Sequence, residues 1–320
     1  MKEIWAIATS VSSVREILGG ARKLADEKGL TVRAVYFGAE QEADGLFAAG
    51  AQVVTLFPAL DGHQLPEVAT EQLAALAVAH DVALIMLPAN RRTRPWSARL
   101  AAALSAGCVT DCQGIQWSDG TLELKHNMYG GAGVLTESAA VLPVVATIPG
   151  GVMEPYAGAV ATGVIERAEL TAPSKAAVVE AVEELASSGV DITAAASVVG
   201  IGRGVANEGD LPMINDLASL LGAEVGCTRP VSEDMHFLPS DRYIGLSGKT
   251  IRPQLYVGIG ASGQIQHVAG VRDAKVIVSI NNDEHAPIFD ASDYYIVGDL
   301  YTVVPMLIEK IKQVRTEAAG

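Results

Sequence analysis

The chain is short of basic residues, aromatic residues and cysteines, and these scarcities exclude several classes of protein. Its 23 Lys and Arg residues stand against 37 Asp and Glu residues, for a net charge of −14. This balance argues against a nucleic-acid partner, because phosphate binding needs a basic surface. No apolar run approaches the roughly 20 residues that span a bilayer, so no membrane insertion is expected.

The three cysteines do not make a disulfide framework. Cys108 and Cys112 have no second pair beside them, and we expect two small core residues rather than a metal or redox site. Cys227 is expected to be a small packed neighbour of Thr228 and Arg229. The sequence therefore predicts no metal site.

The composition and length favour a two-domain protein with packed cores. Hydrophobic residues make up 49% of the 320 residues and charged residues 19%, which excludes a largely disordered chain. The N-terminus starts directly on a strand-like run at Ile4 and shows neither a basic targeting arm nor a secretory signal. We therefore expect a cytoplasmic protein.

The N-terminal half alternates β-rich runs with alanine-rich helical stretches, which is typical of a sheet with crossover helices. Strands are predicted at 4–8, 31–37, 52–56, 82–87, 121–126, 138–142 and 144–148, and helices at 14–28, 73–80 and 99–104. From about 154 to 190 the pattern loosens into a linker-like segment that includes Pro173-Ser174-Lys175 and Ser187-Ser188-Gly189. We place the boundary near 190, giving domains 1–190 and 191–320. Each is expected to be an α/β domain with a mainly parallel sheet and helices on both faces, the second one doubly wound.

Two glycine-rich turns in the C-terminal half follow strand-like runs. Gly200-Ile201-Gly202-Arg203-Gly204 precedes a predicted helix at 211–221, a context in which backbone N–H groups and a helix N-terminus meet phosphate. Its Gly-x-Gly-x-Gly spacing is not the Gly-x-Gly-x-x-Gly of NAD-binding folds. The turn by itself is equally compatible with a tight structural turn, although Arg203 can pair with a phosphate.

The second turn is the stronger signal. The strand at 255–260 opens into Ser262 and Gly263, and Gln264, Gln266 and His267 then cluster where an apolar helix face would be expected. A surface turn that merely needs glycine does not explain these polar side chains. The sequence predicts an anion-binding turn here.

Two further strands, predicted at 276–280 and 294–298, end at Asn281 and Asp299. Ligands of open parallel sheets lie beyond the carboxyl ends of the strands, so both residues suit ribose hydroxyls or an adenine edge. Either one alone is more often a helix N-cap, and Asp299 precedes a helix predicted at 300–312. The binding hypothesis depends on the set.

Read in order, these segments resemble the electron transfer flavoprotein alpha subunit. The resemblance covers essentially all of 195–310, through Gly202-Arg203-Gly204, Thr228-Arg229-Pro230, 243–248, 255–260, 262–267, Asn281, 286–289 and Gly298-Asp299-Leu300. The N-terminal half is similar more loosely, through Arg91-Arg92, Thr110-Asp111-Cys112 and Met128-Tyr129-Gly130-Gly131. These details look like the bacterial branch linked to carnitine metabolism and nitrogen fixation.

The resemblance implies one FAD held mainly by the C-terminal domain. Arg229 would lie against the isoalloxazine ring near N5 and His267 at its O2/N1 edge, where a cation or a hydrogen-bond donor favours anionic flavin; these two are the expected catalytic residues. Ser247 and Thr228 replace threonine and serine but keep the hydroxyl, whereas Leu246 replaces a common glutamine. The remaining predicted FAD contacts are Arg203, Ser262 and Gly263 at the pyrophosphate, Asn281, Asp299 and Leu300 at the adenosine, Gln266 near the flavin end, and Ile244, Gly245, Gln264 and Ile265.

The resemblance also implies an electron carrier that forms a heterodimer with a beta subunit, mainly through the N-terminal domain. Its expected partner is an acyl-CoA dehydrogenase or a similar redox protein. A bifurcating member that uses NADH and a second FAD in the beta subunit stays open, because that site lies largely in the other chain. From a different class, an NAD(P)-dependent dehydrogenase is the alternative. Arg91, Arg92 and Arg94 are candidates for partner contact or for a solvated loop.

Overall fold

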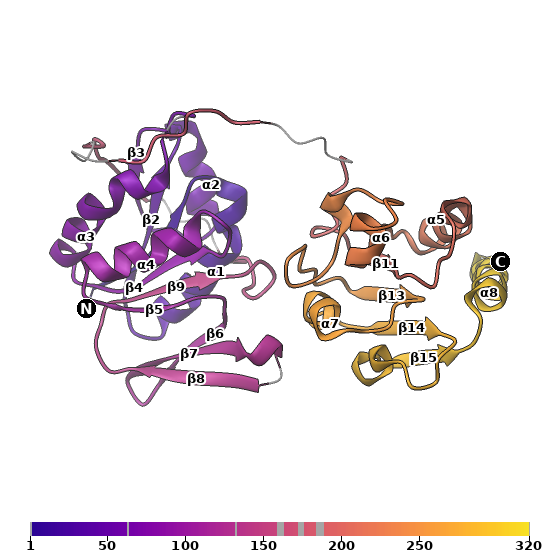
Figure 1. The fold of residues 1–320 in the computed structure, drawn as a ribbon. Coiled ribbons are helices and arrows are strands. Elements are labelled where there is room, and N and C mark those ends of the chain that lie inside the picture. Colours follow the sequence, from indigo (N-terminus) through magenta and orange to yellow (C-terminus); the bar gives the residue numbers. More distant parts are fainter. Residues whose placement is uncertain are drawn as a thin grey trace. The chain divides into compact units, whose positions relative to one another are not determined.

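The computed structural model describes residues 2–62, 64–131, 133–158, 163–171, 176–183 and 189–319. The chain divides into two compact units, Met1–Glu183 and Glu184–Gly320, drawn from indigo to magenta and from orange to yellow in Figure 1. Each unit is built around a parallel β-sheet with helices on both faces, which confirms the predicted fold class.

The N-terminal unit contains a seven-stranded sheet in which every pair of neighbours is parallel, in the order β10-β3-β2-β1-β4-β9-β5. Its strands are β1 (Glu3–Ala8), β2 (Thr31–Phe37), β3 (Val53–Phe57), β4 (Val82–Pro88), β5 (Gly107–Val109), β9 (Val144–Ile148) and β10 (Val164–Arg167). The central strands β1, β2 and β4 are buried along nearly their whole length. This explains their continuous apolar runs, because a parallel sheet is covered on both faces.

Helices α1 (Val11–Asp26) and α2 (Ala43–Ala48) cover one face of this sheet, and α3 (Thr70–Ala79) and α4 (Thr93–Ala103) cover the other. Helix α1 begins where Ser10 accepts a hydrogen bond from the Ser13 N–H. It buries Val14, Ile17 and Leu18, whose three- and four-residue spacing places them on one helix face. Alternate residues of β1 pack into the two cores, so the strand fixes both layers.

A buried ion pair joins several strands of the sheet. Arg33 on β2 donates to Glu3 on β1 at 2.7 and 2.8 Å and to Thr55 on β3 at 2.8 Å, and it also pairs with Glu166 on the edge strand β10. Burial acts to raise the pKa of Glu3, but hydrogen bonds from Arg33 and Trp5 outweigh it and hold the pKa below its ordinary value. The cluster ties β10 to the sheet.

A small antiparallel sheet, β6-β7-β8, follows β5; its strands are β6 (Cys112–Ser118), β7 (Thr121–Met128) and β8 (Gly133–Ala139). The strand predicted at 138–142 is therefore misplaced. Strand β8 is largely exposed and carries no clear apolar alternation, so the sequence pattern does not show where this strand begins.

The predicted linker 154–190 is also partly wrong, because the exposed strand β10 lies within it and pairs with β3. Pro173-Ser174-Lys175 and Ser187-Ser188 of that segment lie outside the described residues.

The C-terminal unit contains a five-stranded sheet of parallel strands in the order β12-β11-β13-β14-β15. Its strands are β11 (Ser197–Ile201), β12 (Glu224–Cys227), β13 (Leu255–Ile259), β14 (Ile277–Asn281) and β15 (Tyr294–Val297). The chain passes from β11 outward to β12 and then returns to β13 on the other side of β11. The carboxyl ends of β11 and β13 are therefore the topological switch point, where such sheets bind ligands.

Helices α5 (Leu211–Leu221) and α8 (Leu300–Ala319) cover one face of this sheet, and α7 (Ile265–Val271) packs on the other. The short α6 (Arg229–Glu233) follows β12. Helix α5 ends at Gly222, which adopts a left-handed conformation and donates its N–H to the Ala218 carbonyl. Short 3₁₀ turns complete the chain at Glu40–Glu42, Pro66–Ala69, Tyr129–Gly131, Glu208–Asp210, Ser240–Arg242 and Pro287–Ala291.

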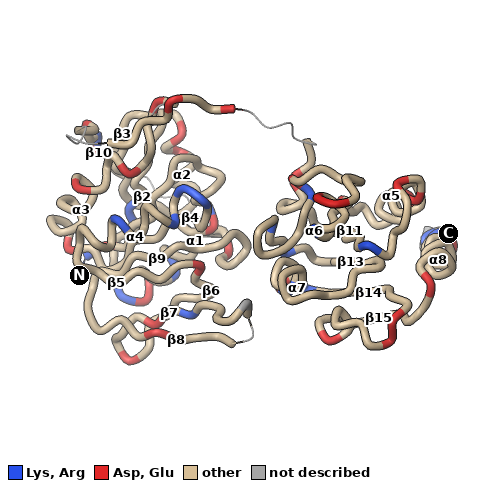
Figure 2. Tube along the Cα trace, viewed as in Figure 1, with Lys and Arg blue, Asp and Glu red and all other residues tan. Residues whose placement is uncertain are grey.

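Acidic positions are spread over loops and helices of both units (Figure 2). Within the described ranges, no helix combines the length and the apolar character needed to cross a membrane.

Candidate functional site

A cavity of about 630 Å³ lies at the carboxyl edge of the five-stranded sheet, at the switch point between β11 and β13. Thirteen of the sixteen residues predicted to bind a cofactor line it: Arg203, Thr228, Arg229, Ile244, Ser247, Ser262, Gly263, Gln264, Gln266, His267, Asn281, Asp299 and Leu300. Gly245, Leu246 and Ile265 do not line it, although they adjoin residues that do. The size of the cavity is within the range of small-molecule and cofactor sites.

The two glycine turns meet at this edge with their backbones in contact. The Gly204 N–H donates to the Gly260 carbonyl at 3.0 Å, and a Cβ placed on Gly202 would lie 2.3 Å from the same oxygen. Side chains are excluded from this contact, so bare backbone faces the cavity. Such turns present N–H groups to anions.

The helix expected to follow the first turn does not reach the cavity. Helix α5 begins at Leu211, after a 3₁₀ turn at Glu208–Asp210, and its residues do not line the site. The N-terminus of α5 is therefore not among the groups that line the cavity, and its contact with phosphate stays a prediction. Before α5 the chain is bonded to Tyr301, which lines the cavity: the Tyr301 hydroxyl accepts from the Ala206 N–H at 3.0 Å and donates to Asp210 at 2.7 Å.

Two arginines bring positive charge to the cavity. Arg203 is exposed at the first turn, and Arg229 is the first residue of α6. The Nε of Arg229 donates to the Glu233 carboxylate at 2.6 Å, and this hydrogen bond raises the pKa of the guanidinium. Its side chain is 63% exposed, so the cation stays accessible to a bound group.

The loop between β12 and β13 supplies hydroxyl groups. Ser247 Oγ lies 2.9 Å from the hydroxyl of Tyr243, and the Leu246 N–H donates to the Gln266 carbonyl at 2.9 Å. The Leu246 side chain is 60% exposed and does not line the cavity. The effect of replacing the common glutamine at this position stays a prediction. Tyr243 lines the site and was missed from the sequence, because a tyrosine beside a short strand resembles core.

His267 lines the cavity from α7 and is 6% exposed. Its Nδ1 lies 3.1 Å from the Ile244 carbonyl oxygen and its Nε2 lies 2.8 Å from the Tyr256 hydroxyl. A carbonyl only accepts, so Nδ1 carries the proton of that bond. Burial lowers the pKa of His267 although the Ile244 bond opposes it, which favours a neutral ring.

The ends of β14 and β15 close the far side of the cavity. Asn281 Nδ2 donates to the Ala261 carbonyl at 2.9 Å, which ties the end of β14 to the second glycine turn. Asp299 precedes α8, and its carboxylate accepts from the Thr302 hydroxyl at 3.2 Å. Both residues line the cavity, so a structural role does not prevent ligand contact.

Both units of the chain match models of one protein family. Residues 191–272 match the electron transfer flavoprotein FAD-binding domain, and residues 10–187 match the electron transfer flavoprotein domain. The chain belongs to the electron transfer flavoprotein family. Its C-terminal unit is therefore an FAD-binding domain, as predicted.

Individual relatives agree over nearly the full length. The chain is 35% identical over 314 residues to the electron transfer flavoprotein subunit YdiR of Escherichia coli (strain K12), covering 98% of this chain and 99% of that protein. It is 32% identical over 311 residues to the protein FixB of Escherichia coli O127:H6 (strain E2348/69 / EPEC), covering 95% and 96%. The protein FixB of Escherichia coli O157:H7 is 30% identical over 306 residues, with the same coverage.

The cavity of this electron transfer flavoprotein chain fits a flavin dinucleotide on chemical grounds. Its two glycine turns leave no room for side chains at their contact, and its cations and hydroxyls lie around them. The FAD-binding match ends at residue 272, so it does not include Asn281, Asp299 and Leu300. The structure places these three residues at the cavity, at the end of β14, after β15 and at the start of α8.

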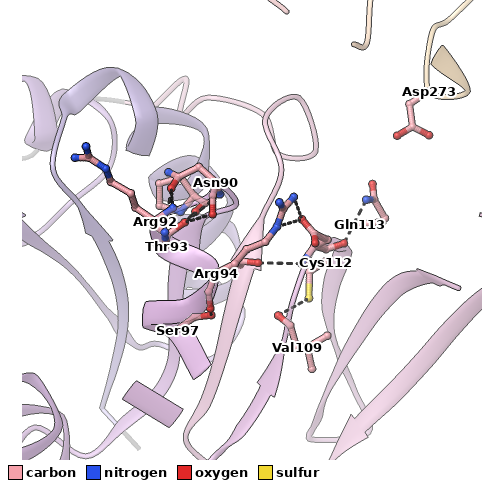
Figure 3. A network of polar contacts seen from close by, with 12 residues as sticks. Asn90, Arg92, Thr93, Arg94, Ser97, Val109, Cys112, Gln113 and Asp273 are labelled. Carbon is pink, nitrogen blue, oxygen red and sulfur yellow. Dashed lines mark hydrogen bonds and ion pairs between the residues drawn. The ribbon is translucent and has the colours of Figure 1, made fainter. Parts of the chain in front are cut away.

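The three arginines considered for partner contact, Arg91, Arg92 and Arg94, lie around the start of α4, where Arg92 and Arg94 belong to a polar network (Figure 3). Asn90 Oδ1 accepts from the backbone N–H groups of Arg92 and Thr93 at 2.9 and 3.0 Å, and Arg94 pairs with Asp111 at 2.7 Å. Arg91 and Arg92 are exposed. The structure thus gives Arg94 a local partner, and contact of Arg91 or Arg92 with another subunit stays a prediction.

The cysteines follow the prediction in two cases of three. Cys112 is fully buried with its Sγ directed at the Val109 carbonyl (Figure 3), and Cys227 is also fully buried. Burial raises the pKa of each of these two thiols to about 12, so both are protonated. Cys108 was wrongly placed in the core: it is exposed, because β5 is a short edge strand. Among the described residues, no three His, Cys, Asp or Glu side chains gather as a metal site requires.

Proposed function

We propose that this chain is the FAD-carrying alpha subunit of a heterodimeric electron transfer flavoprotein, acting in the cytoplasm. Its beta subunit would complete the heterodimer, mainly through the N-terminal unit. The chain would take electrons from an acyl-CoA dehydrogenase or a similar redox protein. The observation that carries the proposal is the convergence of two glycine turns, Arg203 and Arg229 on one cavity of a domain of the FAD-binding family.

Different parts of the cavity would bind different parts of the FAD molecule. Arg203 and the turn at Ser262 and Gly263 would hold the pyrophosphate, because backbone N–H groups and a guanidinium both bind phosphate oxygens. Asn281, Asp299 and Leu300 would hold the adenosine at the ends of β14 and α8. Bound FAD supplies the redox chemistry, and the protein orients it and sets the surrounding charge.

Arg229 would provide the fixed cation at the ring. Its pairing with Glu233 across one turn of α6 holds the guanidinium in place and offsets part of its charge. The electrostatic effect on the flavin is then smaller than that of an isolated arginine. Thr228 precedes it in extended conformation, anchored where its N–H donates to the Ile201 carbonyl at 2.9 Å.

The test is co-expression with a beta subunit, followed by measurement of FAD content and anaerobic reduction followed by absorbance. We expect one FAD per heterodimer in the alpha chain and a reduced FAD content in Arg203→Gln. Arg272→Gln is the matched control, because Arg272 is exposed in the same unit and does not line the cavity. A heterodimer without flavin absorbance after addition of FAD would refute the proposal.

Counting the flavins also separates the two modes of action within the family. Two FAD molecules per heterodimer would support the bifurcating alternative, whereas one FAD with one AMP supports the carrier. A dehydrogenase of the NAD(P) type would instead bind NAD(P) at this cavity in place of FAD, and a titration with both nucleotides distinguishes them.

A further inference from the structure

A buried tyrosine lies directly behind the cavity wall. Tyr256 on β13 has no exposed surface and does not line the cavity, yet its hydroxyl lies 2.8 Å from His267 Nε2. We propose that Tyr256 is a positioning residue of the flavin site, whose hydroxyl holds the His267 imidazole in one orientation and in its Nδ1–H form. The inference rests on the proposed function, because it concerns a residue that lines the FAD cavity.

The space that Tyr256 occupies is made by two glycines on the same face of the sheet. Gly200 on β11 and Gly258 on β13 are directly paired across the strands, and Val198 pairs with Tyr256 two residues earlier. A Cβ on Gly200 would lie 2.2 Å from the Tyr256 hydroxyl oxygen, and one on Gly258 would lie 3.1 Å from its ring. The aromatic ring therefore extends along the sheet over bare backbone toward the carboxyl edge. Because both neighbouring positions are glycines, the volume next to the sheet is large enough for the tyrosine ring and its hydroxyl.

The hydrogen bonds of His267 then fix its protonation pattern. The Ile244 carbonyl requires a proton on Nδ1, so the neutral ring has a lone pair on Nε2. The Tyr256 hydroxyl is the group within reach that satisfies this lone pair, and it donates to it. The two bonds attach to opposite sides of the ring, so together they prevent it from rotating.

This arrangement determines what His267 presents to the cavity. As placed, its Nδ1–H is used by Ile244 and its Nε2 by Tyr256, so the ring offers an uncharged edge and face rather than a free N–H. Removal of the Tyr256 hydroxyl would leave a buried acceptor without a donor. The ring would then turn, or move its proton to Nε2, to find another partner.

The experiment uses the full chain with ¹⁵N-labelled histidine and two-bond ¹H–¹⁵N correlation spectra, which report which ring nitrogen carries the proton. His267→Gln assigns the signals. We expect His267 of the wild type to show a proton on Nδ1 and no proton on Nε2, with and without FAD. In Tyr256→Phe we expect averaged ring signals and a loss of FAD affinity of about two- to tenfold, the effect of one hydrogen bond.

Two further variants make the result specific. Tyr294→Phe is the control: it also removes a tyrosine hydroxyl, but from a side chain that is 68% exposed on β15. We expect the His267 ring signals of this variant to match those of the wild type. Gly200→Ala keeps the Tyr256 hydroxyl but places a methyl group on it, and we expect the His267 signals to change as in Tyr256→Phe. It serves as the second test if Tyr256→Phe does not fold.

The proposal is overturned if wild-type His267 carries its proton on Nε2. It is also overturned if folded Tyr256→Phe matches the wild type in both ring signals and FAD affinity. Failure of the proposed function looks different: no variant and no wild-type chain would bind FAD, whereas the ring signals of the FAD-free chain still report on Tyr256.

Discussion

Replacement of Gly202 by alanine tests the central feature of the site, the backbone contact between its two glycine turns. The added Cβ would lie 2.3 Å from the Gly260 carbonyl oxygen and 2.4 Å from Ala261 Cα, about 1 Å closer than ordinary van der Waals contact. Neither atom belongs to a flexible side chain, so one turn must move as a whole.

The magnitude follows from what that movement breaks. Overpacking of this kind costs about 1–3 kcal/mol, and separating the turns also weakens the bond from the Gly204 N–H to Gly260, worth about 0.5–1.5 kcal/mol. Together we expect about 1.5–4.5 kcal/mol. If all of it appears in binding, FAD affinity falls roughly 10- to 1,600-fold.

The assay is a titration of the FAD-free chain with FAD, followed by flavin fluorescence, with circular dichroism to check folding. Gly209→Ala is the matched control: Gly209 is also a glycine of the region after β11, but a Cβ there meets no atom within 4 Å. A Gly202→Ala chain that folds and binds FAD as tightly as Gly209→Ala would refute the reasoning.

Four further predictions concern single side chains. Arg33→Met leaves the Glu3 carboxylate buried without its cation, so the free energy of unfolding should fall by about 3–5 kcal/mol in chemical denaturation. The folded pKa of Glu3 is lowered, so its contribution is present above the ordinary glutamate pKa and is lost as pH falls through the folded value. Wild type should therefore lose more stability on acidification than Glu3→Gln. Asn281→Ala removes the donor to Ala261, and FAD affinity should fall about two- to tenfold in the same titration. Arg229→Gln should lower the reduction potential of bound FAD, measured by spectroelectrochemistry, because a cation favours the anionic reduced form; Arg229→Lys should lower it less.

Each of these has an outcome that contradicts it. An Arg33→Met chain as stable as the wild type would show that the buried pair is not required for stability. Equal acid sensitivity of wild type and Glu3→Gln would place the titrating group elsewhere. Unchanged FAD affinity in Asn281→Ala would make the Ala261 contact dispensable, and a potential unaffected by Arg229→Gln would place that cation away from the ring.

The sequence alone determined the two α/β domains, because strands buried on both faces are continuously apolar and their glycine or proline ends are local signals. The central strands β1, β2, β4 and β13 were predicted within one or two residues. Strand β8 was misplaced, and strands β5, β6, β10 and β12 were missed. Strands β8 and β10 are exposed edge elements whose pairing, rather than composition, makes them strands.

The sequence also supplied most of the residues that meet at the cavity, because polar side chains and glycines at strand ends are visible one strand at a time. Tertiary structure decided how they are used. The contact of Gly202 with Gly260 joins turns nearly sixty residues apart, and α5 does not line the site although it is the first α-helix after the first turn. The environment of His267 depends on the Ile244 carbonyl and on the hydroxyl of Tyr256. From the sequence, Tyr256 is predicted only to be a core residue of a strand. The local sequence pattern predicts which residues are polar or apolar and which element they belong to. Their hydrogen-bond partners depend on strand register and on packing between segments that are distant in the sequence.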